Sequence, residues 1–114
     1  MPKDRISQVN ELMKQELANI VMREIEIPDG TVLTITRVEA TPNLQQARVY
    51  ISVVPDEQGK EVVKILQRNI YSIQQLVNER LHMRPVPRIQ WTLETSAIQT
   101  QRVEQLLDQI RKEG

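Results

Sequence analysis

The spacing of apolar residues predicts a helix at the start of the chain. The apolar positions recur at intervals of three and four, so they would share one helical face: Ile6, Val9, Leu12, Met13, Leu17, Ile20 and Val21. Asp4 or Ser7 is a suitable residue to cap its first turn. The helix must end before Pro28, because Pro28-Asp29-Gly30 is typical of a turn.

Alternation of apolar and polar residues then predicts two strands. In residues 31–40, Leu33 and Ile35 alternate with threonines. In residues 46–54, one face of the strand would be turned to the core: Ala47, Val49, Ile51 and Val53. The other face would be left in solvent: Gln46, Arg48, Tyr50 and Ser52. The Thr41-Pro42-Asn43 link is short enough for an antiparallel hairpin. One buried face is typical of a sheet that helices cover on one side.

Helical spacing returns after a break at residues 55–59. From Lys60 the apolar positions step by three and four: Val62, Leu66, Ile70, Ile73, Val77 and Leu81. A straight helix of about 23 residues would extend about 35 Å, against a radius of gyration of about 13 Å for a domain of this size. We therefore predict a bend at Asn69, because asparagine adopts helix-ending conformations more readily than its neighbours.

A third strand is predicted from Arg88 to about Glu94, directly after Arg84-Pro85-Val86-Pro87, with Ile89, Trp91 and Leu93 facing inward. A short helix is predicted from about residue 100 to 112, with one apolar face: Val103, Leu106, Leu107 and Ile110. The order helix, two strands, two helical pieces, strand and helix indicates a single α+β domain over residues 1–114.

Composition narrows the class of protein. The chain of 114 residues has no cysteine, which excludes disulfides and thiolate metal sites. It contains no apolar run of about 20 residues and no signal-peptide pattern at its start, so we expect a cytoplasmic protein. The net charge is zero, but the charge is unevenly spread. Residues 60–91 hold six Lys/Arg and two carboxylates, whereas residues 11–40 hold three Lys/Arg and six carboxylates. This pattern indicates either a cationic binding face or chance segregation of charge.

The residues offer little for catalysis. His82 is the only histidine, and no acidic residue stands beside it in the sequence to act as its partner. The carboxylates show no metal-ligand spacing, and the three glycines make no phosphate-binding motif. We predict no catalytic residue, no metal site, no cofactor and no small-molecule substrate.

Nucleic-acid contact is better supported. Lys60, Lys64 and Arg68 step by four and would share one helical stripe. Arg80, Arg84 and Arg88 gather where the helical segment ends and the last strand begins, while Lys3 and Arg5 add charge at the N-terminal end. Such side chains bind phosphates with little sequence preference; the alternative is an ordinary solvated surface, with Arg80 and His82 near a helix C-terminus. Because we assign Trp91 to the core and Tyr71 partly to it, shape and backbone recognition is expected rather than base stacking.

Two segments resemble the ribosome-binding factor A family of bacterial small-subunit assembly factors. In LTITRVEATPNLQQARVYISVV, Asn43-Leu44 stands where the family has Asp-Leu, and Ala47-Arg48-Val49-Tyr50-Ile51 matches Ala-x-Val-Tyr-Val. In RLHMRPVPRIQWTLETS, residues 83–91 match Leu-Arg-x-x-Pro-x-Leu-x-Phe. The resemblance implies a type-II KH-like domain, with helices packed on one face of a three-stranded sheet. The chain departs from the family at Asn69-Ile70-Tyr71, where Ala-x-Gly is usual, and at Gln74, where arginine is usual.

The resemblance also implies a function and a set of contacts. The protein would be a monomeric, non-enzymatic factor that binds the free 30S subunit and its 16S rRNA, assists late maturation and rRNA processing, and supports growth at low temperature. Together with this resemblance, the positions of the cations predict an RNA-binding set of Lys60, Lys64, Arg68, Asn69, Arg80, Arg84, Arg88, Lys3 and Arg5. The alternative is a protein-interaction adaptor or homodimer with a KH-like fold that has lost RNA binding, which the missing glycine, Gln74 and the zero net charge would favour.

Overall fold

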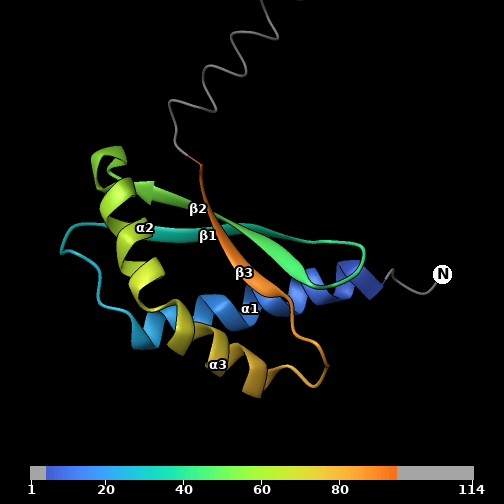
Figure 1. Ribbon diagram of the computed structural model, residues 1–114. Helices are drawn as coiled ribbons and strands as arrows, with labels where there is room; N and C mark the ends of the chain where they lie inside the picture. Colours follow the sequence, from blue (N-terminus) through green and yellow to red (C-terminus); the bar gives the residue numbers. More distant parts are fainter. Residues whose placement is uncertain (1–4, 95–114) are drawn as a thin grey trace, which may run out of the picture.

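The computed structural model describes residues 5–94, which form helices and strands in the predicted order (Figure 1). The elements are α1 (Arg5–Glu24), β1 (Val32–Ala40), β2 (Gln46–Val54), the short 3-10 helix η1 (Asp56–Gln58), α2 (Gly59–Arg68), α3 (Ile70–Arg80) and β3 (Arg88–Glu94). The predicted hairpin, the divided helical segment and the last strand are all confirmed. The helix predicted over residues 100–112 lies outside the described residues, as do Lys3 and Asp4.

The three strands form one sheet in the order β1-β2-β3. β1 pairs with β2 antiparallel, and β3 pairs with β2 parallel, because the chain crosses back through α2 and α3 before it enters β3. The β1–β2 register shifts between Ile35 and Arg37, so Thr36 is an extra residue in β1. The bulge keeps the buried positions Ile35 and Val38 on the same face although they lie three residues apart.

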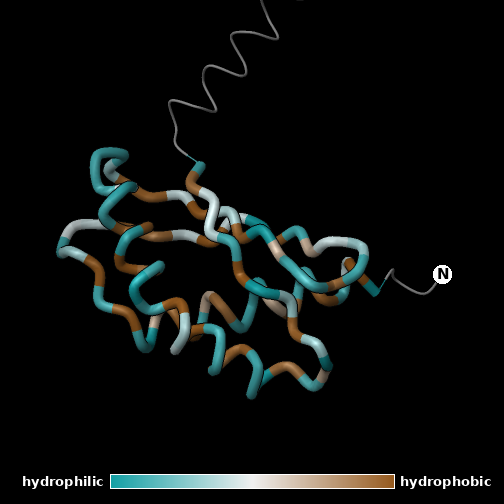
Figure 2. The backbone as a smooth tube through the Cα atoms, viewed as in Figure 1, coloured by the Kyte–Doolittle hydropathy of each residue, from teal (hydrophilic) through white to brown (hydrophobic). Residues whose placement is uncertain are grey.

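α1 and α3 lie against the same face of the sheet (Figure 1). Most of the predicted stripe of α1 is buried: Val9, Met13, Leu17, Ile20 and Val21. Leu12 belongs to the same stripe but is 49% exposed, because it lies at the edge of the apolar arc, which is wider than the contact with the sheet. Ser7 lies inside α1 rather than at its cap. Along the chain, apolar segments alternate with hydrophilic ones (Figure 2).

The bend between α2 and α3 lies at Asn69, as predicted. Its backbone has φ −102° and ψ 11°, so the left-handed conformation behind the prediction is not used. Instead, the side-chain amide of Asn69 donates a hydrogen bond to the carbonyl oxygen of Ile65 at 2.8 Å. The same carbonyl also accepts from the backbone N–H of Asn69 at 3.2 Å, so the side chain adds a second bond at the end of α2. The asparagine side chain thus adds a hydrogen bond at the bend, and the negative φ of Asn69 does not require glycine.

α2 approaches the Leu93 side chain of β3 closely at Gly59, the first residue of α2. A Cβ atom at Gly59 would lie 2.8 Å from Cδ2 of Leu93, so the missing side chain makes room for the last strand.

Trp91 is partly buried against the core, and its indole N–H is buried without a hydrogen-bond partner among the described residues. The prediction that Trp91 belongs to the core is thus confirmed in part, since the side chain packs against the core but is only partly buried.

The open face of the sheet holds one buried side chain. Tyr50 was predicted to face solvent, but only 9% of it is exposed. The guanidinium of Arg37 lies 4.1 Å from the centroid of its ring, and its hydroxyl donates to Glu39 at 3.3 Å. Tyr50 does project from the polar face, so the error concerns its burial: neighbouring side chains on β1 cover the ring.

Candidate nucleic-acid interface

The first group of predicted cations lies along α2. Lys60, Lys64 and Arg68 are exposed, and their spacing of four places them on the side of α2 opposite the buried Val62 and Leu66. Arg68 lies 3.7 Å from the carboxylate of Glu61, with both side chains at least half exposed. Because solvent screens such a pair strongly, it leaves the charge of Arg68 accessible to another anion.

The second group lies at the corner between α3 and β3. Arg84 and Arg88 line the same open hollow of about 690 Å³, whose other lining residues are Gln74, Asn78, Met83, Pro85 and Val86. An adjacent hollow of about 580 Å³ shares Asn78, Met83 and Arg84 and also includes His82. Within residues 5–94, neither Arg84 nor Arg88 is paired with a carboxylate. Their charges are therefore free to attract a phosphate.

Arg80 and Asn69 have structural partners. The guanidinium of Arg80 lies 3.5 Å from the carboxylate of Glu16, which ties α3 to α1 and offsets part of its charge. The side-chain N–H of Asn69 is directed at the carbonyl of Ile65. Of the two N-terminal cations, Arg5 is exposed in the first turn of α1, and Lys3 lies outside the described residues.

These groups do not form one continuous surface. In Figure 1, α2 and the α3–β3 corner lie at opposite ends of the view. The hairpin between β1 and β2 lies beside the corner, since the N–H of Arg88 donates to the carbonyl of Gln45 at 2.9 Å. The structure therefore brings Arg84 and Arg88 together and keeps the cations of α2 as a separate group.

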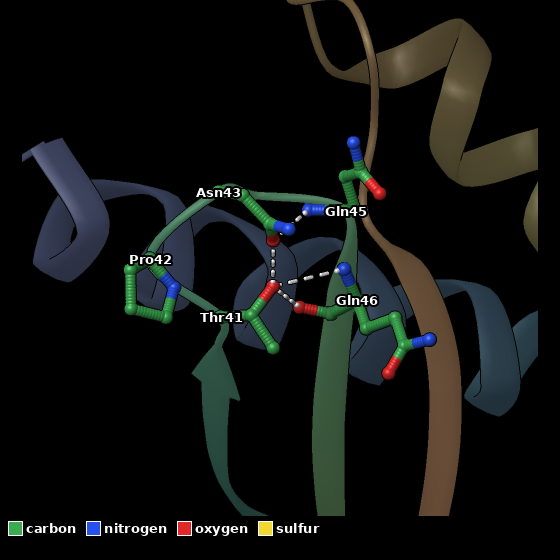
Figure 3. A pocket seen from close by; sticks show the side chains of 5 residues that line it. All are labelled: Thr41, Pro42, Asn43, Gln45 and Gln46. Atoms are coloured by element: carbon green, nitrogen blue, oxygen red, sulfur yellow. Dashed lines mark hydrogen bonds between the residues drawn. The ribbon is translucent and has the colours of Figure 1, made fainter.

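The hairpin loop is held in shape by its own polar side chains (Figure 3). The side-chain oxygen of Asn43 accepts hydrogen bonds from the Thr41 hydroxyl at 2.6 Å and from the Gln45 N–H at 3.1 Å. The Thr41 hydroxyl accepts from the N–H of Gln46 at 3.2 Å. Leu44 adopts a positive φ of 57°. The loop borders a hollow of about 440 Å³ lined by Thr41, Pro42, Asn43, Gln45 and Gln46.

Gln74 positions the start of β3. Its amide nitrogen donates to the carbonyl of Pro87 at 3.1 Å, and its amide oxygen accepts from the N–H of Ile89 at 3.0 Å. These two bonds flank Arg88 and fix the backbone from which it projects. Sequence reasoning recorded Gln74 only as a missing cation, because its partners lie 13 and 15 residues away.

Arg48 is a cation that sequence reasoning missed as a site residue. It is exposed on β2 and pairs in register with Gln90, while Gln46 pairs with Arg88. Arg48 and Arg88 are therefore diagonal neighbours on the open face of the sheet. The alternation in β2 already placed Arg48 in solvent. Its closeness to Arg88 depends on the parallel pairing of β2 and β3, which no local pattern reveals.

The rest of the open face is closer to neutral. Arg37 lies 3.5 Å from the carboxylate of Glu39 and 3.4 Å from that of Glu94. This cluster offsets its own charge, so we assign it to the stability of the sheet. In the part of the chain that the structure describes, no helix is both long enough and apolar enough to cross a bilayer.

Comparison with solved structures identifies the same architecture in known proteins. The crystal structure of ribosome-binding factor A from Thermus thermophilus matches with a TM-score of 0.66 and 19% identity, over 77% of this chain and 93% of that one. A homology model of the Thermus thermophilus factor, fitted into a cryo-EM map of its complex with the 30S subunit, matches with a TM-score of 0.63 and 23% identity, over 73% and 88%.

A third structure, the solution NMR structure of a Thermotoga maritima protein proposed as a ribosome-binding factor A, matches with a TM-score of 0.57 and 25% identity, over 76% of this chain and 80% of that one. Together these likenesses confirm the expected α+β, type-II KH-like fold. A family model described as ribosome-binding factor A matches residues 5–107, which is nearly the whole chain. The chain therefore belongs to the ribosome-binding factor A family.

Proposed function

We propose that this member of a family of non-enzymatic ribosome-binding factors binds the free 30S subunit through its 16S rRNA and assists late maturation and rRNA processing. The observation that carries the proposal is the family match over residues 5–107. The Thermus relative fitted into a 30S complex supports the choice of subunit. Residues 1–114 would act as one domain, as a monomer, in the cytoplasm where ribosomes assemble, with a contribution to growth at low temperature.

The α3–β3 corner is the principal RNA contact in this proposal. Arg84 and Arg88 have no carboxylate partner among the described residues, and Arg48 lies diagonally across the sheet from Arg88. Three guanidinium groups, on β2, on β3 and on the loop between α3 and β3, can contact several phosphates of folded RNA at once. The stripe of α2, with Lys60, Lys64 and Arg68, would hold a second stretch of backbone.

Binding alone is sufficient for such a role. A surface that contacts phosphates in one arrangement stabilises the RNA conformation that presents them, and this shifts the population towards that conformation. Arg80, Asn69 and Arg5 are weaker candidates. Arg80 is paired with Glu16, Asn69 is engaged with Ile65, and Arg5 is distant in sequence from both groups.

The adaptor alternative keeps one observation in its favour, the zero net charge. Gln74 no longer supports it, since that residue has a structural role beside Arg88. Two measurements separate the alternatives. In a sucrose gradient, tagged protein should travel with free 30S subunits. In gel shifts with 16S rRNA, affinity should fall steeply with salt. Binding that is absent, or unchanged across the salt series, would favour the adaptor.

A further inference from the structure

Tyr71 is the most exposed aromatic residue in the described part of the chain. It is 75% exposed, whereas Tyr50 is 9% exposed and Trp91 is partly buried against the core. The sequence-based expectation that Tyr71 belongs partly to the core was therefore wrong. It occupies the first turn of α3, and the buried residues of that helix, Ile73 and Val77, lie on another side. Its ring contributes little to the core.

Tyr71 lies just beyond the cationic stripe of α2. Lys60, Lys64, Arg68 and Tyr71 follow one another at steps of four, four and three. The N–H of Asn69 donates to Ile65 at the end of α2, and the N–H of Ile73 donates to Asn69 at the start of α3. Only Asn69 separates the two helices, so Tyr71 stands three residues after Arg68, on the far side of the bend. The aromatic ring and the Lys64 and Arg68 side chains project from the side of the helices away from the core.

We propose that Tyr71 stacks on an unpaired base of RNA whose backbone runs along Lys64 and Arg68. This inference rests on the proposed function and adds a second mode of contact to it. A solvent-exposed ring offers its face to any base, so the contact tolerates many sequences. The adjacent cations neutralise the phosphates on either side of that nucleotide. The partner is a single-stranded segment or a loop, because a base inside a helix cannot present its face.

The surroundings of Tyr71 favour RNA over an apolar protein partner. Its exposed helical neighbours Ser72, Gln75 and Arg68 are polar or charged. The other exposed large apolar residues of the described chain lie on different elements, namely Leu12 and Met22 on α1, Val32 on β1 and Val54 on β2. A protein-docking patch has a contiguous apolar centre, and the sequence neighbours of Tyr71 supply none.

The test uses the full chain and two probes of equal charge. One probe is an oligoadenylate of about 12 nucleotides, and the other is an abasic strand of the same length. The unchanged protein should prefer the oligoadenylate by roughly 5- to 100-fold. Tyr71→Phe keeps the ring and should keep the preference. Tyr71→Leu and Tyr71→Gln should both lose it, with the same dependence on salt, since no charge is removed. Because the residue is exposed, thermal melting should change little.

Co-sedimentation with 30S subunits separates this inference from the proposed function. If the unchanged protein travels with 30S subunits but does not distinguish the two probes, the stacking contact is refuted and the proposed function stands. If Tyr71→Leu or Tyr71→Gln still prefers the oligoadenylate as strongly as the unchanged protein does, the stacking contact is likewise refuted and the proposed function stands. If the unchanged protein fails to travel with 30S subunits, both proposals fall. A preference lost only when the ring is lost supports the inference.

Discussion

The side-chain oxygen of Gln74 on α3 accepts a hydrogen bond from the backbone N–H of Ile89 on β3 at 3.0 Å. The amide nitrogen of the same side chain donates to the carbonyl of Pro87 at 3.1 Å. One amide thus satisfies both an acceptor and a donor of the incoming strand, because a side-chain amide carries a donor and an acceptor side by side. The contact joins the helix to the strand and holds Arg88 between its two anchor points.

Replacing this amide should destabilise the protein. We expect Gln74→Ala to lower the free energy of unfolding by about 1–3 kcal/mol, because two half-buried backbone groups lose their partners. Gln74→Arg restores the cation usual in the family, but it has no acceptor for Ile89 and should also destabilise. Urea unfolding monitored by circular dichroism measures both variants.

The matched control is Gln75→Ala, an exposed neighbour on the same helix. It should change the free energy of unfolding by less than about 0.5 kcal/mol. A Gln74→Ala protein as stable as the Gln75→Ala protein would show that the bridge is not important for docking β3.

The bend at Asn69 yields a second prediction. Because its φ is −102°, glycine offers no conformational advantage there, and it removes the hydrogen bond to Ile65. We expect Asn69→Gly to lower the free energy of unfolding by about 1–2 kcal/mol, through the lost bond and the greater freedom of glycine in the unfolded chain. Thermal unfolding followed by calorimetry measures it. Gln67→Gly, at an exposed position of α2, controls for the glycine alone, and an equal loss in both would exclude a special role for the Asn69 side chain.

Periodicity was sufficient to predict the α-helices and strands of this fold, whereas the 3-10 helix η1 lies in a segment that was expected only to be a break. Each strand and helix combines a clear repeat with a break at Pro, Gly or Asn, so β2 and β3 were expected at their observed bounds. Asn69 could be located because a straight helix would be too long for the domain. The side-chain hydrogen bond at the bend was missed, because the pattern of apolar residues cannot reveal a hydrogen bond from Asn69 to Ile65.

What sequence reasoning missed depends on contacts between distant residues. The burial of Tyr50 requires Arg37 from the neighbouring strand, and the closeness of Arg48 to Arg88 requires the parallel pairing of β2 and β3. The pairing of Arg80 with Glu16 spans 64 residues. A cation count along the chain treats Arg80 and Arg84 alike, whereas their surroundings in the fold differ.

The hydrogen bonds of the hairpin loop predict how stability changes when Asn43 is replaced by aspartate, the residue usual in the family. The side-chain oxygen of Asn43 accepts from Thr41 and Gln45, and a carboxylate would accept both bonds with greater strength. We expect Asn43→Asp to leave stability unchanged or raise it by up to about 1 kcal/mol, whereas Asn43→Ala should lower it by about 1 kcal/mol. Parallel urea titrations compare the two variants. Equal losses in both would contradict the assigned acceptor role.

The surroundings of each arginine predict which substitution weakens RNA binding. Arg84 has no carboxylate partner in residues 5–94, whereas Arg37 lies between Glu39 and Glu94. We expect Arg84→Ala to lower the affinity for 30S subunits and to reduce the slope of log affinity against log salt by about 1, since one phosphate contact is lost.

Arg37→Ala is the control for the loss of one positive charge. It should leave the salt slope nearly unchanged and should instead lower the free energy of unfolding by about 1 kcal/mol, because Tyr50 loses its covering guanidinium. Arg80→Ala should reduce the salt slope by an amount between those of Arg84→Ala and Arg37→Ala, because the charge of Arg80 is partly offset by Glu16. Filter binding across a salt series ranks the three variants. Equal reductions in slope would mean that net charge alone governs binding, and the arrangement of cations at the α3–β3 corner would then have no special part in it.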